Sequence, residues 1–466
     1  MHTALDGACD SLRAFQPGQA GRKPRVPLRH LGLAMTPLHD HPLRYALTNE
    51  LHARPSPVIP VPSTAVFMAL KPAQDAVARD RGRDRAHLFD LLDRHGAAHP
   101  APDATHHAAE VGRHGLKWEN HTEVTTWMAF SDGLTERPFD PASFDVFPTD
   151  WLAAAPGVRI TSILFRIEEM PLRDGQCDCA ALGRRLEEWF VAESLASSCV
   201  LDEAAVLASD FRIDPAGHIR MAVFVHPNTG KRRVGRIIQR LCEIEMYRAM
   251  AMLGLARARK VNAEMGALDR RLADLQAEMS GGAGHAEQVL NNLMTVSAEL
   301  ERLEMASSFR FGATRAYEAI VHDRIEVLRE TRFEGRQTLA EFMRRRWDPA
   351  MRTVKAAEAR LALLSERAMR AGRLLSTQVE VARSAQNQEI LQSMDRRADL
   401  QLRLQHTVEG LSVVAISYYA VGLVSNVLAP LGEAVGVGKT GVYAGVTPLV
   451  VLAVWWALRR IRARLH

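Results

Sequence analysis

A short segment near the N-terminus combines an acid, an imidazole and a guanidinium. Glu50, His52 and Arg54 alternate with apolar residues within Asn49–Pro55. A guanidinium binds phosphate or carboxylate oxygens through two parallel hydrogen bonds, so Arg54 is suited to an anionic or phosphorylated ligand. The alternative is structural, with Glu50 and Arg54 forming a local ion pair and His52 capping a sheet. Both interpretations stay open, and all three are candidate ligand-binding residues.

His121 and Glu123 form a second candidate pair. They are two positions apart in a segment expected to be a strand, where such side chains face the same side. An imidazole and a carboxylate on one face can provide two metal ligands, or a base and its partner. Two ligands do not complete a site, so a metal requires a third group such as His39, His41 or His52. The metal is therefore unknown, and His121 and Glu123 join the candidate ligand-binding residues.

No motif in the sequence identifies an enzyme. There is no Gly-x-Ser-x-Gly or His-Glu-x-x-His, and Gly436, Gly438 and Gly441 do not form a phosphate-binding loop. Cys177 and Cys179 lack the two-residue spacing of zinc or thioredoxin-like sites. The five scattered cysteines predict free thiols in a reducing compartment. We assign no catalytic residue, and the cofactor is unknown.

The charge balance does not predict a nucleic-acid partner. The chain has 59 basic and 54 acidic residues, a formal net charge of +5. A hydrophobic fraction of 47% is ordinary for a globular protein, so the positions of the charges are more informative than their number.

Two uncharged runs near the C-terminus predict transmembrane helices. Residues 410–432 and 440–458 contain no charged side chain, and each is long enough to cross a hydrocarbon layer of about 30 Å. The link Glu433–Lys439 is short, so the two helices form a hairpin with both flanks on one side. The alternative is a buried helical hairpin in a soluble core.

Arginines flank this hairpin on both sides and predict its orientation. Arg396, Arg397 and Arg403 precede it, and a basic tail at 459–466 follows it, whereas the link has a single base, Lys439. The excess of basic residues marks the cytoplasmic side, which predicts a two-span membrane protein with both termini in the cytoplasm.

One face of the first predicted span has small and polar side chains. Tyr419, Gly422 and Asn426 follow Ala415 at helical spacing. Such a stripe packs one helix on another more often than it lines a pore, and both roles are candidates.

Residues 36–229 alternate predicted strands with predicted helices. The strands are Ala65–Leu70, Glu123–Phe130, Arg159–Ile167, Val206–Ile213 and His218–Val225, and the helices are Arg85–His95 and Ala181–Leu195. We expect one cytoplasmic α+β domain with a mixed sheet. Residues 1–35 are expected to be disordered, with Met35 as an alternative start to Met1.

Residues 230–406 have helical periodicity and predict a helical hairpin and a coiled-coil stalk. Apolar residues repeat at steps of three and four from Val261 to Met279, and glycines within 281–284 then interrupt the pattern. After Pro349 one apolar face continues toward the transmembrane region at 407–458. So long a helix needs partner helices, from this chain or from a second copy, and a homo-oligomer is expected.

Several segments of the chain resemble a bacterial family of predicted membrane-anchored proteins. The segments are His41–Arg44, Asn49–Pro55, Lys117–Glu123, Arg310–Tyr317, Ser393–Arg397, Thr407–Ser412 and Ala415–Tyr419. They are similar to the family catalogued as domain of unknown function 3422. The resemblance covers nearly all of the chain after Met35 and implies an anchor in the bacterial inner membrane, but the family has no established activity.

Two functions of different class follow from this layout. The favoured one is a membrane-anchored scaffold or regulator that contacts the lipid bilayer and binds an unidentified small molecule or partner. The alternative is an oligomeric channel or transporter for divalent cations, with the layout of CorA-type channels. The Gly-Met-Asn filter of those channels is absent here, and the link has one acid, Glu433, and one base, Lys439, which give no net attraction for cations.

Overall fold

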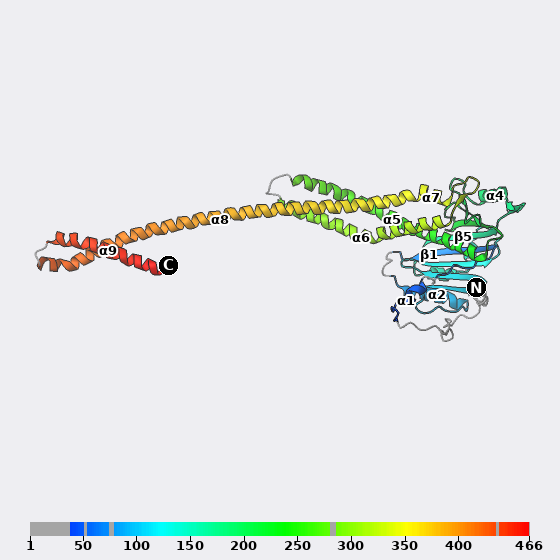
Figure 1. Cartoon of the computed structure of the whole chain (residues 1–466), viewed down its shortest axis with the longest axis horizontal. Coiled ribbons are helices and arrows are strands. Elements are labelled where there is room, and N and C mark those ends of the chain that lie inside the picture. The colour runs from blue at the N-terminus through cyan, green and yellow to red at the C-terminus, as the bar shows by residue number, and fades with distance from the viewer. Residues whose placement is uncertain (1–37, 51–53, 74–78, 280–285, 435–437, 466) are drawn as a thin grey trace, which may run out of the picture. The chain divides into compact units, whose positions relative to one another are not determined.

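The computed structural model describes residues 38–50, 54–73, 79–279, 286–434 and 438–465 (Figure 1). The predicted disordered segment and the alternative start at Met35 lie outside these residues. The chain divides into two compact units. The first comprises Met1–Asp269 and Ala298–Ser365, and the second comprises Arg270–Ser297 and Glu366–His466.

The first unit is built on a mixed nine-stranded sheet with the order β11-β8-β9-β10-β5-β1-β4-β3-β2. Its strands are β1 (Ser63–Lys71), β2 (His106–Val111), β3 (His114–Asn120), β4 (Thr125–Asp132), β5 (Val158–Glu169), β8 (Ala196–Val200), β9 (Ala205–Ser209), β10 (Ile219–Val225) and β11 (Thr331–Arg332). β5 and β10 pair in parallel, while the other neighbouring strands pair antiparallel. A separate two-stranded sheet joins β6 (Leu172–Arg173) to β7 (Gln176–Cys177). The prediction of a mixed sheet is confirmed.

Helices cover both faces of this sheet. They are α2 (Arg81–Arg94), α3 (Thr149–Ala153), α4 (Cys179–Trp189), α7 (Leu339–Arg346) and parts of the long helices α5 (Lys231–Glu278), α6 (Ala286–Val327) and α8 (Asp348–Ala434); a 3-10 turn lies at Pro141–Phe144. The described side chains of α1 (Arg44–Glu50) are exposed and belong to neither core cluster. Phe67 packs into the cluster formed with α5, α6 and α7, whereas its neighbour Val66 packs into the cluster formed with α2, α3 and α4. Since successive side chains on a strand point to opposite faces, the central strands are apolar on both sides.

His87 on α2 lies inside the second of these clusters. Its ring is stacked on Trp151 at 3.8 Å and contacts the edge of Trp127 at 5.7 Å. Burial is the main reason that the pKa of His87 is lowered from 6.5 to about 4, while Asp90 opposes this shift and Arg94 adds to it. The imidazole is therefore neutral in the folded protein at neutral pH.

We expect His87 to make the first unit sensitive to acid. The folded-state pKa lies below the unfolded value, so the unfolded chain binds the proton first as the pH falls, and stability is lost between pH 6.5 and about pH 4. Over this range the protonation of His87 should lower the free energy of unfolding by about 3 kcal/mol. Urea unfolding followed by tryptophan fluorescence across this range should show a smaller loss in His87→Phe than in the wild type. Equal losses in the two proteins would contradict the prediction.

The long helices pack through the apolar positions expected from the sequence. Val261, Met265, Leu268, Leu272 and Leu275 of α5 are all buried. In the first unit Arg360 of α8 pairs with Asp269 of α5 at 2.9 Å. In the second unit Arg367 of α8 donates to Gln276 of α5 at 3.0 Å. The predicted glycine break at 281–284 lies outside the described residues, and supercoiling of these helices stays a prediction.

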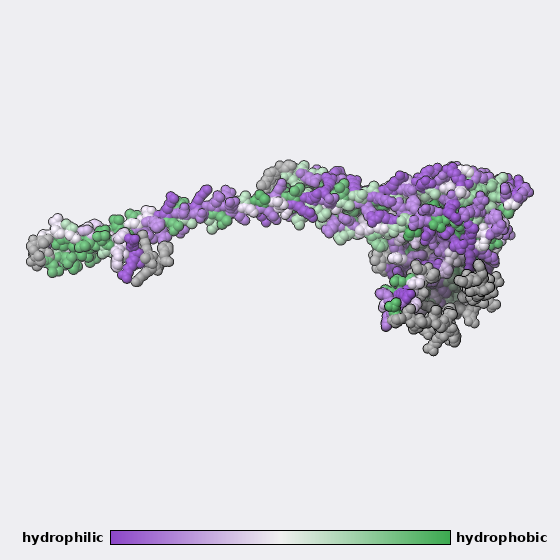
Figure 2. Space-filling view, in the orientation of Figure 1, coloured by the Kyte–Doolittle hydropathy of each residue, from purple (hydrophilic) through white to green (hydrophobic). Residues whose placement is uncertain are grey.

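The second unit ends in two apolar helices. α8 continues to Ala434 with Pro430 inside it, and α9 extends over Lys439–Leu465. Both are long and apolar enough to cross a membrane, and their most apolar stretches are 11% and 0% buried. In Figure 2 the surface of this part of the second unit is largely hydrophobic, and the preceding stretch of α8 is largely hydrophilic.

Candidate functional site

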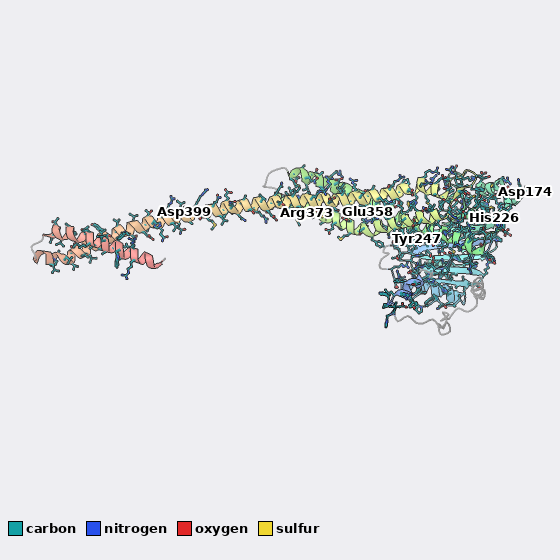
Figure 3. The ribbon with its side chains drawn as sticks, viewed as in Figure 1. Asp174, His226, Tyr247, Glu358, Arg373 and Asp399 are labelled. Atoms are coloured by element: carbon teal, nitrogen blue, oxygen red, sulfur yellow. The ribbon has the colours of Figure 1, made fainter. Side chains whose placement is uncertain are left out.

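A polar cavity of about 410 Å³ lies in the first unit, where the sheet meets α5 and α6. It is lined by Arg54, Arg81, Thr105, residues 120–124, Tyr247, Met250 and Tyr317. Tyr247, labelled in Figure 3, lies on α5 beside the sheet. The volume is in the range of small-molecule sites in proteins. Three of the predicted ligand-binding residues, Arg54, His121 and Glu123, line this one cavity.

The structure corrects the expected position of His121 and Glu123. They do not lie on a strand: β3 ends at Asn120 and β4 begins at Thr125, so both residues are in the connecting turn. The backbone N–H of His121 donates to the carbonyl of Val124 at 2.9 Å and closes this turn. Both side chains line the cavity from this turn. Strand alternation therefore does not explain why they face the same space.

Glu123 joins the turn to α6. Its side chain is almost completely buried, and its carboxylate accepts hydrogen bonds from Arg310, with Nη1 at 3.4 Å from Oε1, and from the Tyr317 hydroxyl at 2.5 Å. Burial, followed by the bond to Glu123, raises the pKa of Tyr317, so this hydroxyl stays protonated and donates. The charge of Glu123 is therefore compensated by Arg310 before any ligand enters.

His121 lies between the cavity and a small polar cluster behind it. Its Nε2 is 3.4 Å from the Thr126 hydroxyl and 4.0 Å from Glu119. Burial and, to a lesser extent, the positive charge of Arg54 lower the pKa of His121, while Glu119 opposes the shift. At neutral pH His121 is thus a neutral donor or acceptor at the cavity wall.

The small cluster behind His121 links the sheet to α5. Lys117 donates to Gln239 at 3.1 Å and pairs with Glu119 at 3.2 Å, and Gln239 donates to Glu243 at 2.9 Å. The space here is about 20 Å³, enough for a water molecule and too small for a larger ligand. This cluster therefore supports the wall of the main cavity.

A buried ion pair fixes the other side of the cavity. Arg79 and Asp84 are 2.9 Å apart with side chains that are 3% and 6% exposed, and Arg79 also donates to the side chain of Asn120. Burial lowers the pKa of Arg79 and raises the pKa of Asp84, and their mutual attraction opposes both shifts. The backbone N–H of Asn120 donates to the carbonyl of Thr105 at 2.7 Å, so this wall is held by both side-chain and backbone bonds.

Two predicted residues cannot be placed at the cavity. Glu50 is the last residue of α1, and its side chain, like His52, lies outside the described part of the chain. The described lining of the cavity does not include His39 or His41. Within the described residues no group of three or more His, Cys, Asp or Glu side chains is arranged to hold a metal ion.

The sequence analysis missed several residues of the site, namely Arg81, Tyr247, Arg310 and Tyr317. One signal was available. Three of the segments that resemble the family, Asn49–Pro55, Lys117–Glu123 and Arg310–Tyr317, contribute residues to the cavity or to the bonds that close it. Their convergence is visible only in three dimensions, because 187 positions separate Glu123 from Arg310.

The predicted face of the first apolar helix is mostly exposed in the described chain. Tyr419 is 71% exposed, Asn426 is exposed and Gly422 is partly buried. The buried polar side chains of this stretch are instead Ser417 and Ser425. A packing or pore role for Tyr419, Gly422 and Asn426 stays a prediction.

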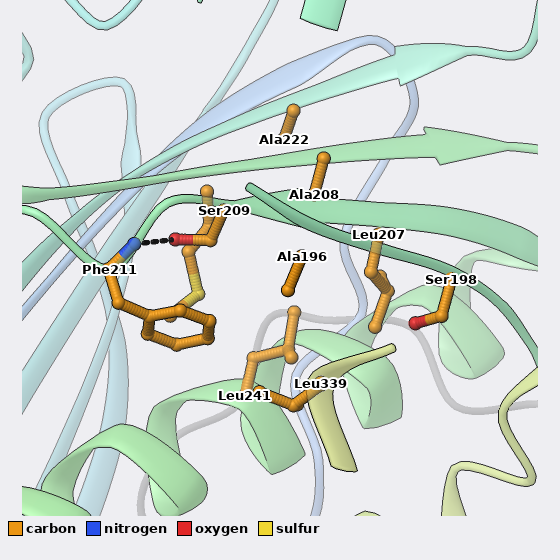
Figure 4. A pocket seen from close by; sticks show the side chains of 10 residues that line it. Ala196, Ser198, Leu207, Ala208, Ser209, Phe211, Ala222, Leu241 and Leu339 are labelled. Carbon is orange, nitrogen blue, oxygen red and sulfur yellow. Dashed lines mark hydrogen bonds between the residues drawn. The ribbon is translucent and has the colours of Figure 1, made fainter. Parts of the chain in front are cut away.

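A second small cavity, lined mainly by apolar side chains, lies between the sheet and α5 and α7 (Figure 4). Leu207, Leu241 and Leu339 line it, and its one drawn hydrogen bond is from the backbone N–H of Phe211 to the Ser209 hydroxyl at 3.1 Å. Its volume is about 20 Å³, which marks a packing gap in the core and not a ligand site.

Comparison with known proteins identifies a family of unknown function. Neither a curated protein nor a solved structure matches the chain. The model of one family, described as protein of unknown function (DUF3422), matches residues 39–465, which is nearly the whole chain. The chain belongs to the DUF3422 family.

Proposed function

We propose that this protein is a membrane-anchored scaffold or regulator on the cytoplasmic side of a bacterial inner membrane. Its first unit binds a ligand in the polar cavity, and α8 and α9 anchor the chain in the bilayer. The supporting observation is the exposure of large apolar side chains in α9, where Leu449 is 69%, Leu452 is 61% and Trp456 is 58% exposed. Burying them in lipid removes this surface from water.

The orientation of the anchor follows from charge. Arg459 and Arg460 lie at the end of the apolar stretch of α9, and Arg396, Arg397 and Arg403 precede that of α8. The guanidinium of Arg459 lies 5.1 Å from the ring centre of Trp455, and this pairing of a cation with an interfacial aromatic suits a headgroup region. Both termini are therefore assigned to the cytoplasm.

Membrane fractionation tests the anchor. We expect the full-length chain to sediment with membranes after cell breakage, to resist extraction by high salt and alkaline carbonate, and to dissolve in detergent, since lipid burial does not depend on ionic contacts. The matched control ends at Gln405 and lacks both apolar helices. It should stay in the supernatant. Recovery of the full-length chain in the supernatant without detergent would contradict the proposal.

Self-association through α8 is part of the proposal. From Val381 to Glu409 nearly every side chain of α8 is exposed, including Ile390, Met394 and Leu404 at 50%, 60% and 65%. Most of the stability of a helix in a protein comes from packing of its apolar face, so this stretch gains from a partner. Copies anchored in one bilayer bring these stretches together in parallel at high effective concentration, so a second copy is the expected partner.

The subunit number separates this function from the alternative of a channel. A channel with two spans per chain needs several copies around an axis, whereas a scaffold can work as a monomer or a dimer, and a monomer would rule out the channel. Light scattering of the detergent-solubilised protein measures the number. A dimer would support the scaffold, and a ring of five or more copies with Asn426 at the axis would favour the cation channel of CorA-like layout.

A further inference from the structure

The charges around the polar cavity select for an anion. Arg54 and Arg81 line it, and Glu123 is the one carboxylate among its described lining residues. The Glu123 carboxylate already binds Arg310 and Tyr317, and His121 is neutral because burial and Arg54 lower its pKa. The described lining of the cavity therefore combines two arginines with one carboxylate that is already paired, a set of charges that favours an anion.

Uncharged donors accompany these two arginines. Thr105, Asn120 and Thr122 line the same cavity, and Asn120 is held on Thr105 through the backbone and on Arg79 through its side chain. Two guanidinium groups with hydroxyl and amide donors form a common environment for the oxygens of a phosphate group. The charge of Arg79 is itself compensated by Asp84, so Arg79 positions Asn120 and does not add to the binding charge.

Part of the cavity lining is aromatic and apolar. Tyr247 and Tyr317 have ring centres 5.3 Å apart, and Met250 and Val124 also line the cavity. Burial raises the pKa of Tyr247, so both rings stay neutral phenols. A bare phosphate ion would occupy only a small part of about 410 Å³. The remaining space and this part of the lining fit an organic group attached to the phosphate.

We propose that the cavity binds a small molecule with a phosphate ester, with Arg54 and Arg81 contacting the phosphate and Tyr247 and Tyr317 contacting the organic part. This inference rests on the proposed ligand-binding role of the first unit. It names the chemistry of the ligand. The phosphate has two sources, a soluble metabolite or the headgroup of a lipid, and the test separates them.

Phenyl phosphate is a suitable soluble probe because it combines both groups. Calorimetry with the detergent-solubilised full-length protein should show phenyl phosphate binding more tightly than inorganic phosphate, and phenol binding weakest. Arg54→Ala and Arg81→Ala should each weaken phenyl phosphate binding by about tenfold or more, the loss of a charged hydrogen-bonded contact. Tyr247→Ala should weaken phenyl phosphate and leave inorganic phosphate unchanged.

Arg113→Ala is the matched control, since Arg113 is exposed in the turn between β2 and β3 and does not line the cavity. It should bind as the wild type does. Arg54→Lys keeps the positive charge but lacks the planar guanidinium that makes two parallel hydrogen bonds. Partial binding by Arg54→Lys would show that a loss in Arg54→Ala is not misfolding. Unchanged phenyl phosphate affinity in both arginine variants, with tryptophan fluorescence as in the wild type, would overturn the proposal.

Lipid vesicles identify the source of the phosphate. Full-length protein reconstituted in phosphatidylcholine, with and without phosphatidic acid, is titrated with phenyl phosphate. Competition by phosphatidic acid that disappears in Arg54→Ala assigns the site to a lipid headgroup, and no competition assigns it to a soluble metabolite. Competition that is equal in the variant and the wild type would contradict the role of Arg54. Membrane sedimentation is independent of every one of these variants, so failure of the ligand proposal is distinguishable from failure of the anchor.

Discussion

Replacing Glu123 with alanine should destabilise the first unit by about 3 to 5 kcal/mol, because it leaves a buried charge without a partner. Arg310, whose side chain is 16% exposed, loses its counter-ion, and the Tyr317 hydroxyl loses its acceptor at 2.5 Å. The turn between β3 and β4 also loses its attachment to α6. Urea unfolding of the detergent-solubilised protein, followed by tryptophan fluorescence, measures the change in the free energy of unfolding.

Two further variants show whether the charge is responsible. Glu123→Gln keeps an acceptor for Tyr317 but not the charge, so it should lose less than Glu123→Ala. The double variant Glu123→Ala with Arg310→Met removes both charges and should recover part of the loss, since no buried charge is left uncompensated. The single variants Glu123→Ala and Arg310→Met complete the cycle. If their separate losses add up to the loss of the double variant, the pair has no mutual interaction.

Gly235→Ala should be at least as damaging, for a different physical reason. A Cβ at Gly235 on α5 would lie 1.7 Å from the carbonyl oxygen of Pro57, which is a backbone atom and cannot rotate away. The same segment is held on α5 by the backbone N–H of Ile59, which donates to the carbonyl of Lys231 at 3.3 Å. Overpacking typically costs about 1 to 3 kcal/mol and occasionally more, and a clash with backbone that cannot rotate away belongs to the largest values. Pro57 is three residues from Arg54 of the cavity lining, so ligand affinity should fall together with stability.

The matched control is another glycine inside a long helix. A Cβ at Gly312 on α6 would meet nothing within 4 Å. Alanine there should stabilise the protein by about 0.5 to 1 kcal/mol, because alanine loses less conformational entropy than glycine in a helix. Opposite signs at Gly235 and Gly312 in urea unfolding would separate the close contact from helix propensity, and a stable Gly235→Ala would contradict the packing described here.

The sequence was most informative where one pattern persists over many residues. The apolar seam of α5 from Val261 to Leu275 and the two uncharged C-terminal runs each repeat one signal, so a local error does not change the interpretation. The strands at the centre of the sheet, such as β1 and β5, were found because both of their faces are apolar. Each of these features depends on local sequence and on burial alone.

The edges of the sheet were harder to predict. β2 and β3 contain histidines, glycine and lysine in place of a clear alternation, and β11 has only two residues. Such strands form because a neighbour offers backbone partners, as in the pairing of Thr331 with Cys199. This is a property of the tertiary structure that the local sequence does not contain.

The candidate site was predictable in part for the same reason. Arg54, His121 and Glu123 were chosen by their chemistry, and the structure places them on one cavity. Tyr247 and Tyr317 were not chosen, because an aromatic residue in a long helix is ordinary core material until the opposing wall is known. The turn at 121–124 was missed because we expected the strand that contains the apolar run after Val124 to begin earlier in the chain than it does.

The exposed part of α8 has a consequence for how the length of this protein can change. Between Val354 and Val379 the buried positions of α8 interlock with other helices, and one inserted residue would rotate everything after it by about 100° and misalign that seam. Between Val381 and Glu409 the described chain makes few such contacts. Within one chain, insertions and deletions are therefore tolerated there, and insertions of whole heptads would also preserve the register of the proposed contact between copies. This stretch is a spacer whose reach can be adjusted at about 1.5 Å per residue while the ligand cavity stays intact.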